Sequence, residues 1–193
     1  MTAGERGRQS GRDPKAALLE KVVAYAADGG IAGRSLREIA AGIGSSHRML
    51  LYHFGSREGL MAAVVGFMEA RQRDTMAALA AQAASPSDAI RAQWRELTGA
   101  QVLPFVRLFF EIFGLAVQGT PGATAMLDDL TDPWLREGSA VAAQQGYQLD
   151  TATIRLGVAV ARGLLIDLLA GADPQEVSAA HERFVEMVER AQR

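Results

Sequence analysis

Hydrophobic positions recur along this chain with the spacing of helices and not of strands. In residues 14–29 the apolar side chains fall at intervals of three and four residues, which places them on one helical face. Asp13 is suited to cap this segment and Pro14 to occupy its first turn, while Gly29 and Gly30 end it. No stretch alternates polar and apolar residues as a strand would. We therefore predict an all-α chain of about nine helices.

The pattern also suggests how the helices are grouped. We expect residues 1–12 to form a disordered basic arm, residues 13–56 a three-helix unit, and residues 57–193 a larger helical unit. The arm could contact phosphate or simply be a solvated tail. The predicted helices cover residues 14–29, two short segments within 35–54, and then about 57–82, 87–99, 102–118, 122–145, 150–171 and 174–191.

The segment from Ser35 to Phe54 has the pattern of two short helices joined by a tight turn. Ser35 can cap the first helix, and Glu38 three residues later completes a capping box. Two glycines, at positions 42 and 44, bracket a turn that can require a positive φ. The pattern is typical of a helix-turn-helix motif, in which the second helix enters the DNA major groove. An ordinary helical hairpin is the alternative interpretation.

If this motif binds DNA, its polar residues and those beside it make the contacts. Either Ser45 or Ser46 can cap the second helix, and capped helix starts suit phosphate. Arg48 is the best candidate for reading a guanine, because arginine bonds both acceptors of that base. The predicted DNA-binding residues are Ser35, Arg37, Ser45, Ser46, His47, Arg48, Tyr52, His53 and Arg57.

Residues 15–65 resemble the N-terminal DNA-binding domain of TetR-type (TetR/AcrR) transcriptional regulators. The matching features are a hydrophobic first helix with a Gly-Gly stop, a capped helix with an Ile-Ala pair, and a turn glycine. They continue with the ending Leu-x-Tyr-His-Phe and with Gly-Ser-Arg-Glu-Gly-Leu at the next helix start. The resemblance implies an N-terminal helix-turn-helix domain and a helical domain that binds a ligand and dimerises through its last two helices.

Two positions depart from the family pattern. The family usually has an aromatic residue that contacts phosphate where Leu51 stands, and a glycine where Arg48 stands. Tyr52 is the nearest aromatic residue and could take over the phosphate contact. Either the DNA contacts are rearranged or the preferred operator differs.

Charge is distributed unevenly, although the net charge is only −2. Residues 1–60 hold nine Lys or Arg and six Asp or Glu, whereas the remaining 133 residues hold eleven and sixteen. A basic end on an acidic body is expected where one end meets phosphate.

Large apolar side chains gather in the second half of the chain. They form either an ordinary core or an apolar pocket between helices, and the pocket would suit an apolar or aromatic ligand. The predicted pocket residues are Phe67, Trp94, Phe105, Phe109, Phe113, Met126, Trp134, Tyr147 and Arg162.

Residues 152–170 are apolar on nearly every side, so this helix needs cover on more than one face. A partner chain would provide that cover, and a symmetric dimer would present two recognition helices to two half-sites. The predicted dimer interface comprises Ile154, Val158, Leu165, Leu169, Val177, Phe184, Met187 and Val188.

Composition narrows the remaining classes. The chain has no cysteine, no apolar run long enough for a membrane span and no secretory signal at its start, which favours the cytosol. His47 and His53 lie on different faces of a helix, so shared metal ligation is not expected. No catalytic or cofactor signature is present.

The sequence therefore predicts a ligand-responsive regulator and no enzyme, metal or cofactor. We expect a homodimeric repressor that a small molecule releases from a palindromic operator in double-stranded DNA. A helical adaptor that binds other proteins is the alternative.

Overall fold

The described chain is entirely helical, as the sequence predicts. The structure is a computed structural model, and it describes residues 13–29, 31 and 33–191; the predicted arm at 1–12 lies outside them. Within this part there are nine α-helices, one 3₁₀ turn and no strand. The elements are α1 (Pro14–Gly29), α2 (Leu36–Gly42), α3 (His47–Phe54), α4 (Arg57–Gln82), α5 (Pro86–Leu97), α6 (Leu103–Val117), η1 (Thr124–Leu127), α7 (Asp132–Gln144), α8 (Thr151–Ala170) and α9 (Pro174–Ala191).

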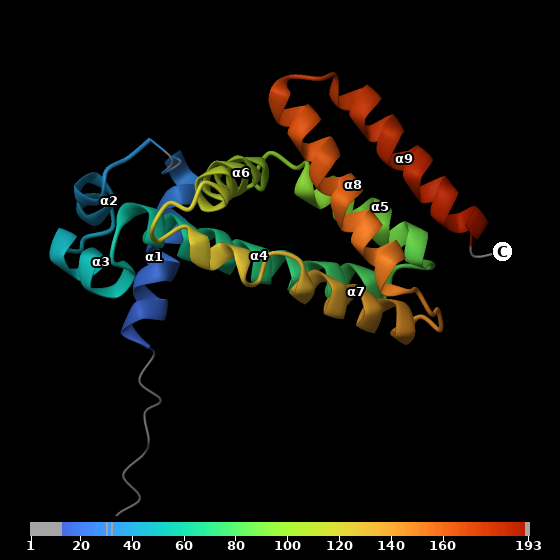
Figure 1. The fold of residues 1–193 in the computed structure, drawn as a ribbon, viewed down its shortest axis with the longest axis horizontal. Coiled ribbons are helices and arrows are strands. Elements are labelled where there is room, and N and C mark those ends of the chain that lie inside the picture. The colour runs from blue at the N-terminus through green and yellow to red at the C-terminus, as the bar shows by residue number, and fades with distance from the viewer. Residues whose placement is uncertain (1–12, 30, 32, 192–193) are drawn as a thin grey trace, which may run out of the picture.

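The long helix α4 joins the two ends of the molecule (Figure 1). Helices α1, α2 and α3 gather at its N-terminal end, and α5, α7, α8 and α9 lie toward its C-terminal end (Figure 1). Helix α6 packs beside α4 and next to the N-terminal helices. A displacement of α4 would therefore be felt at both ends.

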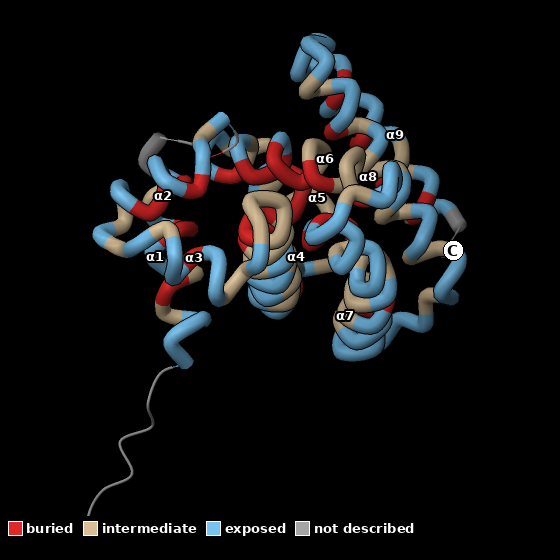
Figure 2. Tube along the Cα trace, turned by 60° about the vertical axis from the view of Figure 1, so that its left-hand side comes forward, coloured by how far each residue is buried: buried red, intermediate tan, exposed pale blue. Residues whose placement is uncertain are grey.

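Two clusters of buried apolar residues hold these helices together. The larger one joins α1–α4 to α6 through side chains such as Val22, Ile39, Leu50, Leu60 and Ile112, all of which are fully buried. The smaller one connects α5, α6, α8 and α9. Figure 2 shows buried positions gathered along α6 and the helices that face it. The N-terminal helices thus share one core with α6.

Local capping signals fix most helix starts. Ser46, Ser56 and Ser85 each accept a hydrogen bond from the backbone N–H three residues on, which satisfies a donor at the helix start. Asp13 and Asp173 precede the prolines that begin α1 and α9 and accept a backbone N–H bond in the same way. These residues are adjacent in sequence to the groups they cap, so the sequence alone predicts them.

One predicted helix is wrong. The sequence analysis predicts a continuous helix over 122–145, whereas the structure has a loop, the turn η1 and then α7. Gly122 has a φ of +86°, which a helix cannot contain. Pro133 lacks the N–H that a continuous helix would need, so a new helix begins beside it at Asp132.

Candidate DNA interface and ligand cavity

The segment predicted as a helix-turn-helix forms two short capped helices. The Ser35 side chain accepts the Glu38 N–H, and the Glu38 carboxylate accepts the Ser35 N–H at 2.8 Å, so the capping box is confirmed. These bonds lower the pKa of Glu38. Gly44 has a φ of +65° in the turn. Gly42 has another role, since a Cβ there would lie 2.4 Å from the Tyr25 ring.

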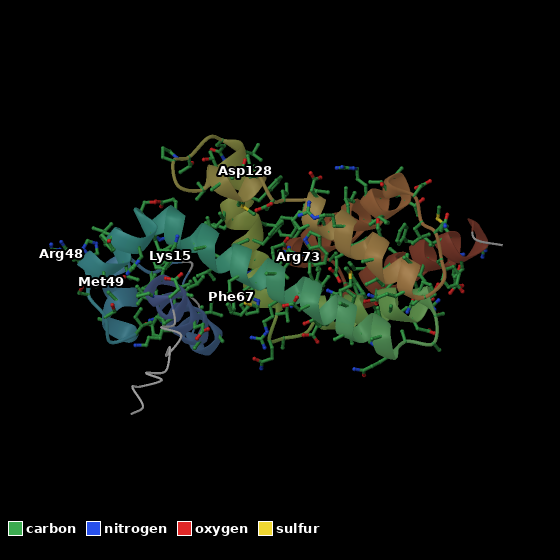
Figure 3. The ribbon with its side chains drawn as sticks, turned by 90° about the horizontal axis from the view of Figure 1, so that it is seen from below. Lys15, Arg48, Met49, Phe67, Arg73 and Asp128 are labelled. Carbon is green, nitrogen blue, oxygen red and sulfur yellow. The ribbon has the colours of Figure 1, made fainter. Side chains whose placement is uncertain are left out.

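Helix α3 rests on the core through one fully buried side chain, Leu50. Its opposite side is exposed: Tyr52 keeps 80% of its surface in solvent, Met49 42% and Leu51 39%. Arg48 points outward at the end of the molecule (Figure 3). Exposed aromatic and apolar side chains on a basic helix mark an interaction surface. The sequence analysis did not include Met49 and Leu51 among its DNA contacts.

Most predicted DNA-binding residues lie on or beside α2 and α3. Ser35 and Ser46 are the two helix caps, and Arg37 is exposed on α2. Ser45 lies half-buried in the turn, where its N–H donates to Ala40 O at 2.9 Å. His47 and His53 are also half-buried, and the His53 ring meets the edge of Tyr52 at 5.0 Å between centroids.

Arg57 faces inward instead of toward a DNA surface. Its Nε donates to Arg34 O at 3.0 Å, and its guanidinium lies 3.6 Å from the Glu111 carboxylate and 3.8 Å from that of Glu58. It therefore ties the start of α4 to the segment before α2 and to α6. Sequence reasoning missed this role because Glu111 is distant in the chain.

Two neighbouring cavities lie toward the other end of α4. The smaller one, of about 90 Å³, lies between α4, α6, α7 and α8. The larger one, of about 180 Å³, lies between α5, α7, α8 and α9 and is called here the α5–α9 cavity. Both are lined by Trp134 together with Leu97, Val158 and Ala161.

The predicted pocket residues divide between these cavities and the core. Phe105, Phe109 and Arg162 line the smaller cavity, Trp94 lines the α5–α9 cavity, and Trp134 lines both. Phe67, Phe113 and Met126 instead pack against the larger core cluster, and Tyr147 is exposed. Their helical spacing identified apolar faces but not which neighbour each face meets.

A buried charge network borders the smaller cavity. Glu69 of α4 accepts a hydrogen bond from Trp134 Nε1 at 2.5 Å and lies 3.8 Å from the Arg162 guanidinium. Burial raises the pKa of Glu69 and lowers the pKa of Arg162. Arg162 also donates to Leu130 O at 2.6 Å and sits over the Phe109 ring. The network links α8 and α7 to α4, and sequence reasoning did not find Glu69.

Seven of the eight predicted dimer-interface residues are used within the chain. Leu165, Val177 and Val188 are buried, and Leu169 packs against the smaller core cluster. Ile154, Val158, Phe184 and Val188 line the α5–α9 cavity. Only Met187 among the eight is clearly exposed, at 59%. The faces predicted to meet a partner chain therefore meet α5 and α7 or border a cavity of the same chain.

A different face of α8 is open to solvent. Leu156 is 56% exposed and Ile166 50%, and small residues at 152, 159, 163 and 170 are exposed with them. The positions follow intervals of three and four residues, so they form one apolar stripe along the helix. This stripe was not separated from the inward face in the sequence analysis.

Two other kinds of site were sought in the described residues. No three His, Cys, Asp or Glu side chains in that part of the chain gather closely enough to hold a metal ion. None of the helices described there combines the length and apolar character needed to cross a membrane.

Known proteins share both the motif and the fold. Residues 18–64 match the family model of bacterial regulatory proteins of the tetR family. A putative TetR-family transcriptional regulator from Rhodococcus sp. has 20% identity and a TM-score of 0.70, with 93% of this chain and 98% of that chain covered. No curated protein sequence matches significantly.

Two further solved structures with this fold contain small molecules. A putative transcriptional regulator from Saccharomonospora viridis in complex with choline has 18% identity and a TM-score of 0.63, covering 91% of this chain and 95% of that one. The multidrug binding protein EbrR complexed with imidazole has 24% identity and a TM-score of 0.61, covering 91% and 94%. The N-terminal domain of this chain is therefore that of a TetR-family regulatory protein, and the chain has the fold of these DNA-binding transcriptional regulators, which are not enzymes.

Proposed function

We propose that this chain is a ligand-responsive repressor that binds a palindromic operator as a homodimer and leaves it when a small apolar or aromatic molecule occupies its cavity. The observation that carries the proposal is the contact between the cavities and α4. Trp134 lines both cavities and donates to Glu69 on α4, whose first residues follow directly on the recognition helix.

The exposed side of α3 supports sequence-specific binding. Arg48 lies near the start of this helix, from which side chains reach base edges in the major groove. Tyr52 is exposed enough to contact a phosphate in place of the aromatic residue that the family has at Leu51. Arg37 on α2 adds positive charge to the same end of the molecule.

The apolar stripe on α8 supports dimerisation. Leu156 and Ile166 are too exposed to contribute to the core of one chain, and the small residues between them let another helix approach closely. Pairing of this stripe with its copy would place two recognition helices on one face of DNA. Met187 on α9 extends the apolar surface.

The ligand acts through differential affinity. A molecule that favours a spacing of recognition helices unsuited to the operator must weaken DNA binding by the same free energy. A coupling of roughly 1–3 kcal/mol would lower operator affinity about 5–150-fold. The choline and imidazole complexes support a small-molecule site in this fold, although they concern other proteins.

The test is a selection of random DNA duplexes by the full chain at near-physiological salt, followed by salt titration of the enriched sequences. Enrichment of an inverted repeat supports a dimeric, sequence-specific regulator. Duplexes without a shared motif, bound only at low salt, would contradict specific recognition. Failure to bind any duplex would favour the adaptor hypothesis.

A further inference from the structure

The α5–α9 cavity has no formally charged residue in its lining, in contrast to the smaller cavity. Its walls are apolar apart from Gln93, Thr153 and His181. We propose that this cavity takes an uncharged aromatic ligand that donates one hydrogen bond to Gln93 Oε1. The ligand's effect on DNA rests on the proposed function, whereas its binding does not.

The size of the cavity suits one aromatic ring with a short substituent. Its volume is about 180 Å³. An apolar cavity of roughly 150 Å³ is enough to hold benzene in a protein interior. Small residues create this space, since Gly138, Gly157 and Ala161 line it.

Gln93 supplies the hydrogen-bond acceptor. Only 8% of its surface is exposed, and its Nε2 donates to Gln72 Oε1 at 3.3 Å. Its Oε1 is buried and has no partner within the described chain. Buried carbonyl groups are nearly always hydrogen-bonded, because leaving one unpaired is costly. A ligand donor at this position would satisfy it.

Aromatic rings form the walls beside this acceptor. Trp94 and His181 stack with centroids 4.5 Å apart and planes 11° from parallel, and both line the cavity together with Trp134 and Phe184. Burial and the nearby Arg91 lower the pKa of His181, and Glu182 opposes them. The neutral ring therefore predominates near pH 7, so the histidine does not supply a counter-charge for an anion.

A charged ligand would be poorly accommodated here. Moving an ion into an apolar site is costly unless an opposite charge pairs with it, and this lining offers none. The nearest ion pair on α5 and α9, Arg91 with Glu182, is already closed at 2.6 Å. Glu69 and Arg162 border the other cavity, where they face each other.

The two tryptophans of this chain make binding directly measurable. Both line the α5–α9 cavity, so ligand binding should change the intrinsic fluorescence of the full-length protein. The probes are benzyl alcohol, benzyl methyl ether, ethylbenzene, benzoate and benzylammonium, which keep the ring and vary the donor and the charge.

We expect benzyl alcohol to bind about 5- to 10-fold more tightly than benzyl methyl ether, because only the alcohol donates a hydrogen bond. Benzoate and benzylammonium should bind at least about 100-fold more weakly than the alcohol. The inference is overturned if either ion binds as tightly as the alcohol, if the ether equals the alcohol, or if none of the neutral probes binds.

A variant pair identifies the acceptor. Gln93→Leu should remove the preference for the alcohol over the ether while ethylbenzene still binds. Gln145→Leu is the matched control, because Gln145 Oε1 is also buried without a partner in the described chain but lies outside both cavities. An unchanged preference in Gln93→Leu would overturn the assignment. If that variant does not fold, the ligand series on the unmodified protein decides.

Operator release is measured separately from binding. If benzyl alcohol binds with the expected preferences but leaves the operator complex intact, this inference is supported and the proposed ligand control of DNA binding is contradicted. If the protein binds no duplex, the fluorescence series still decides the ligand class.

Discussion

The two ends of α4 use their polar side chains in opposite ways. At the N-terminal end the polar residues either cap helices, as Ser35 and Ser46 do, or stand exposed, as Arg48 and Tyr52 do. At the other end Glu69, Arg162 and Gln93 lie inside the protein beside aromatic rings. A surface of the first kind suits a large charged partner, and a cavity of the second kind suits a small molecule excluded from water.

The largest expected effect concerns the support beneath the exposed helix. Leu50→Ala should destabilise the protein by about 2–5 kcal/mol, since Leu50 is fully buried and its loss leaves a cavity. Its neighbour Leu51 is 39% exposed, so Leu51→Ala should change stability by only about 0.5 kcal/mol. Urea unfolding of both variants measures this. Equal losses would show that α3 is not anchored through Leu50.

The junction of the two ends can be tested at a glycine. Gly122 has a φ of +86°, and a Cβ there would lie 2.6 Å from Ser56 Oγ and 3.0 Å from Gly59 N at the start of α4. Gly119 also has a positive φ, but around it there is space. Gly122→Ala should therefore cost about 1–3 kcal/mol more than Gly119→Ala in thermal or urea unfolding. The close packing is refuted if the two variants are equally stable.

The base-reading role of Arg48 predicts a loss that depends on DNA sequence. Arg48→Ala should weaken operator binding by about 1–3 kcal/mol and relax the preference at one base pair. Binding to the selected operator and to its single-base variants measures both effects. An equal loss on specific and random DNA would reduce Arg48 to a phosphate contact.

Communication between the two ends can be tested at the tryptophans. Trp134→Phe removes the donor to Glu69 and should reduce ligand-induced operator release several-fold, within the 1–3 kcal/mol range typical of coupling. Trp94→Phe is the control, because the Trp94 indole donates to Ser178 on α9 and not to α4. Release assays with both variants compare them. Equal coupling in the two would exclude the Trp134–Glu69 contact as the route.

The smallest expected effect is one of pH on the cavity end. Because the pKa of His181 is lowered in the folded protein, the unfolded chain takes up this proton first as pH falls below about 6.5. This histidine should therefore cost stability on acidification through that range. His181→Phe should show a shallower loss between pH 7 and pH 5.5 in urea unfolding. An identical pH slope would contradict the shifted pKa.

Local signals made the N-terminal end predictable. The capping box at Ser35, the turn glycine at 44 and the buried Leu50 depend on residues close together in sequence, and the structure has all three. The exception is Arg57. Its side chain bonds Arg34 O and approaches Glu111, so its role depends on how α4 and α6 pack.

The sequence by itself determined the helices, their caps and the recognition motif, because these depend on periodicity and on neighbours within a few residues. Only the tertiary structure decided which apolar faces cover each other. Val177 and Val188 face inward while Leu156 and Ile166 remain exposed, although all four have the same apolar character. Helical periodicity shows that a face is apolar, whereas the packing of distant helices decides whether the same chain covers it.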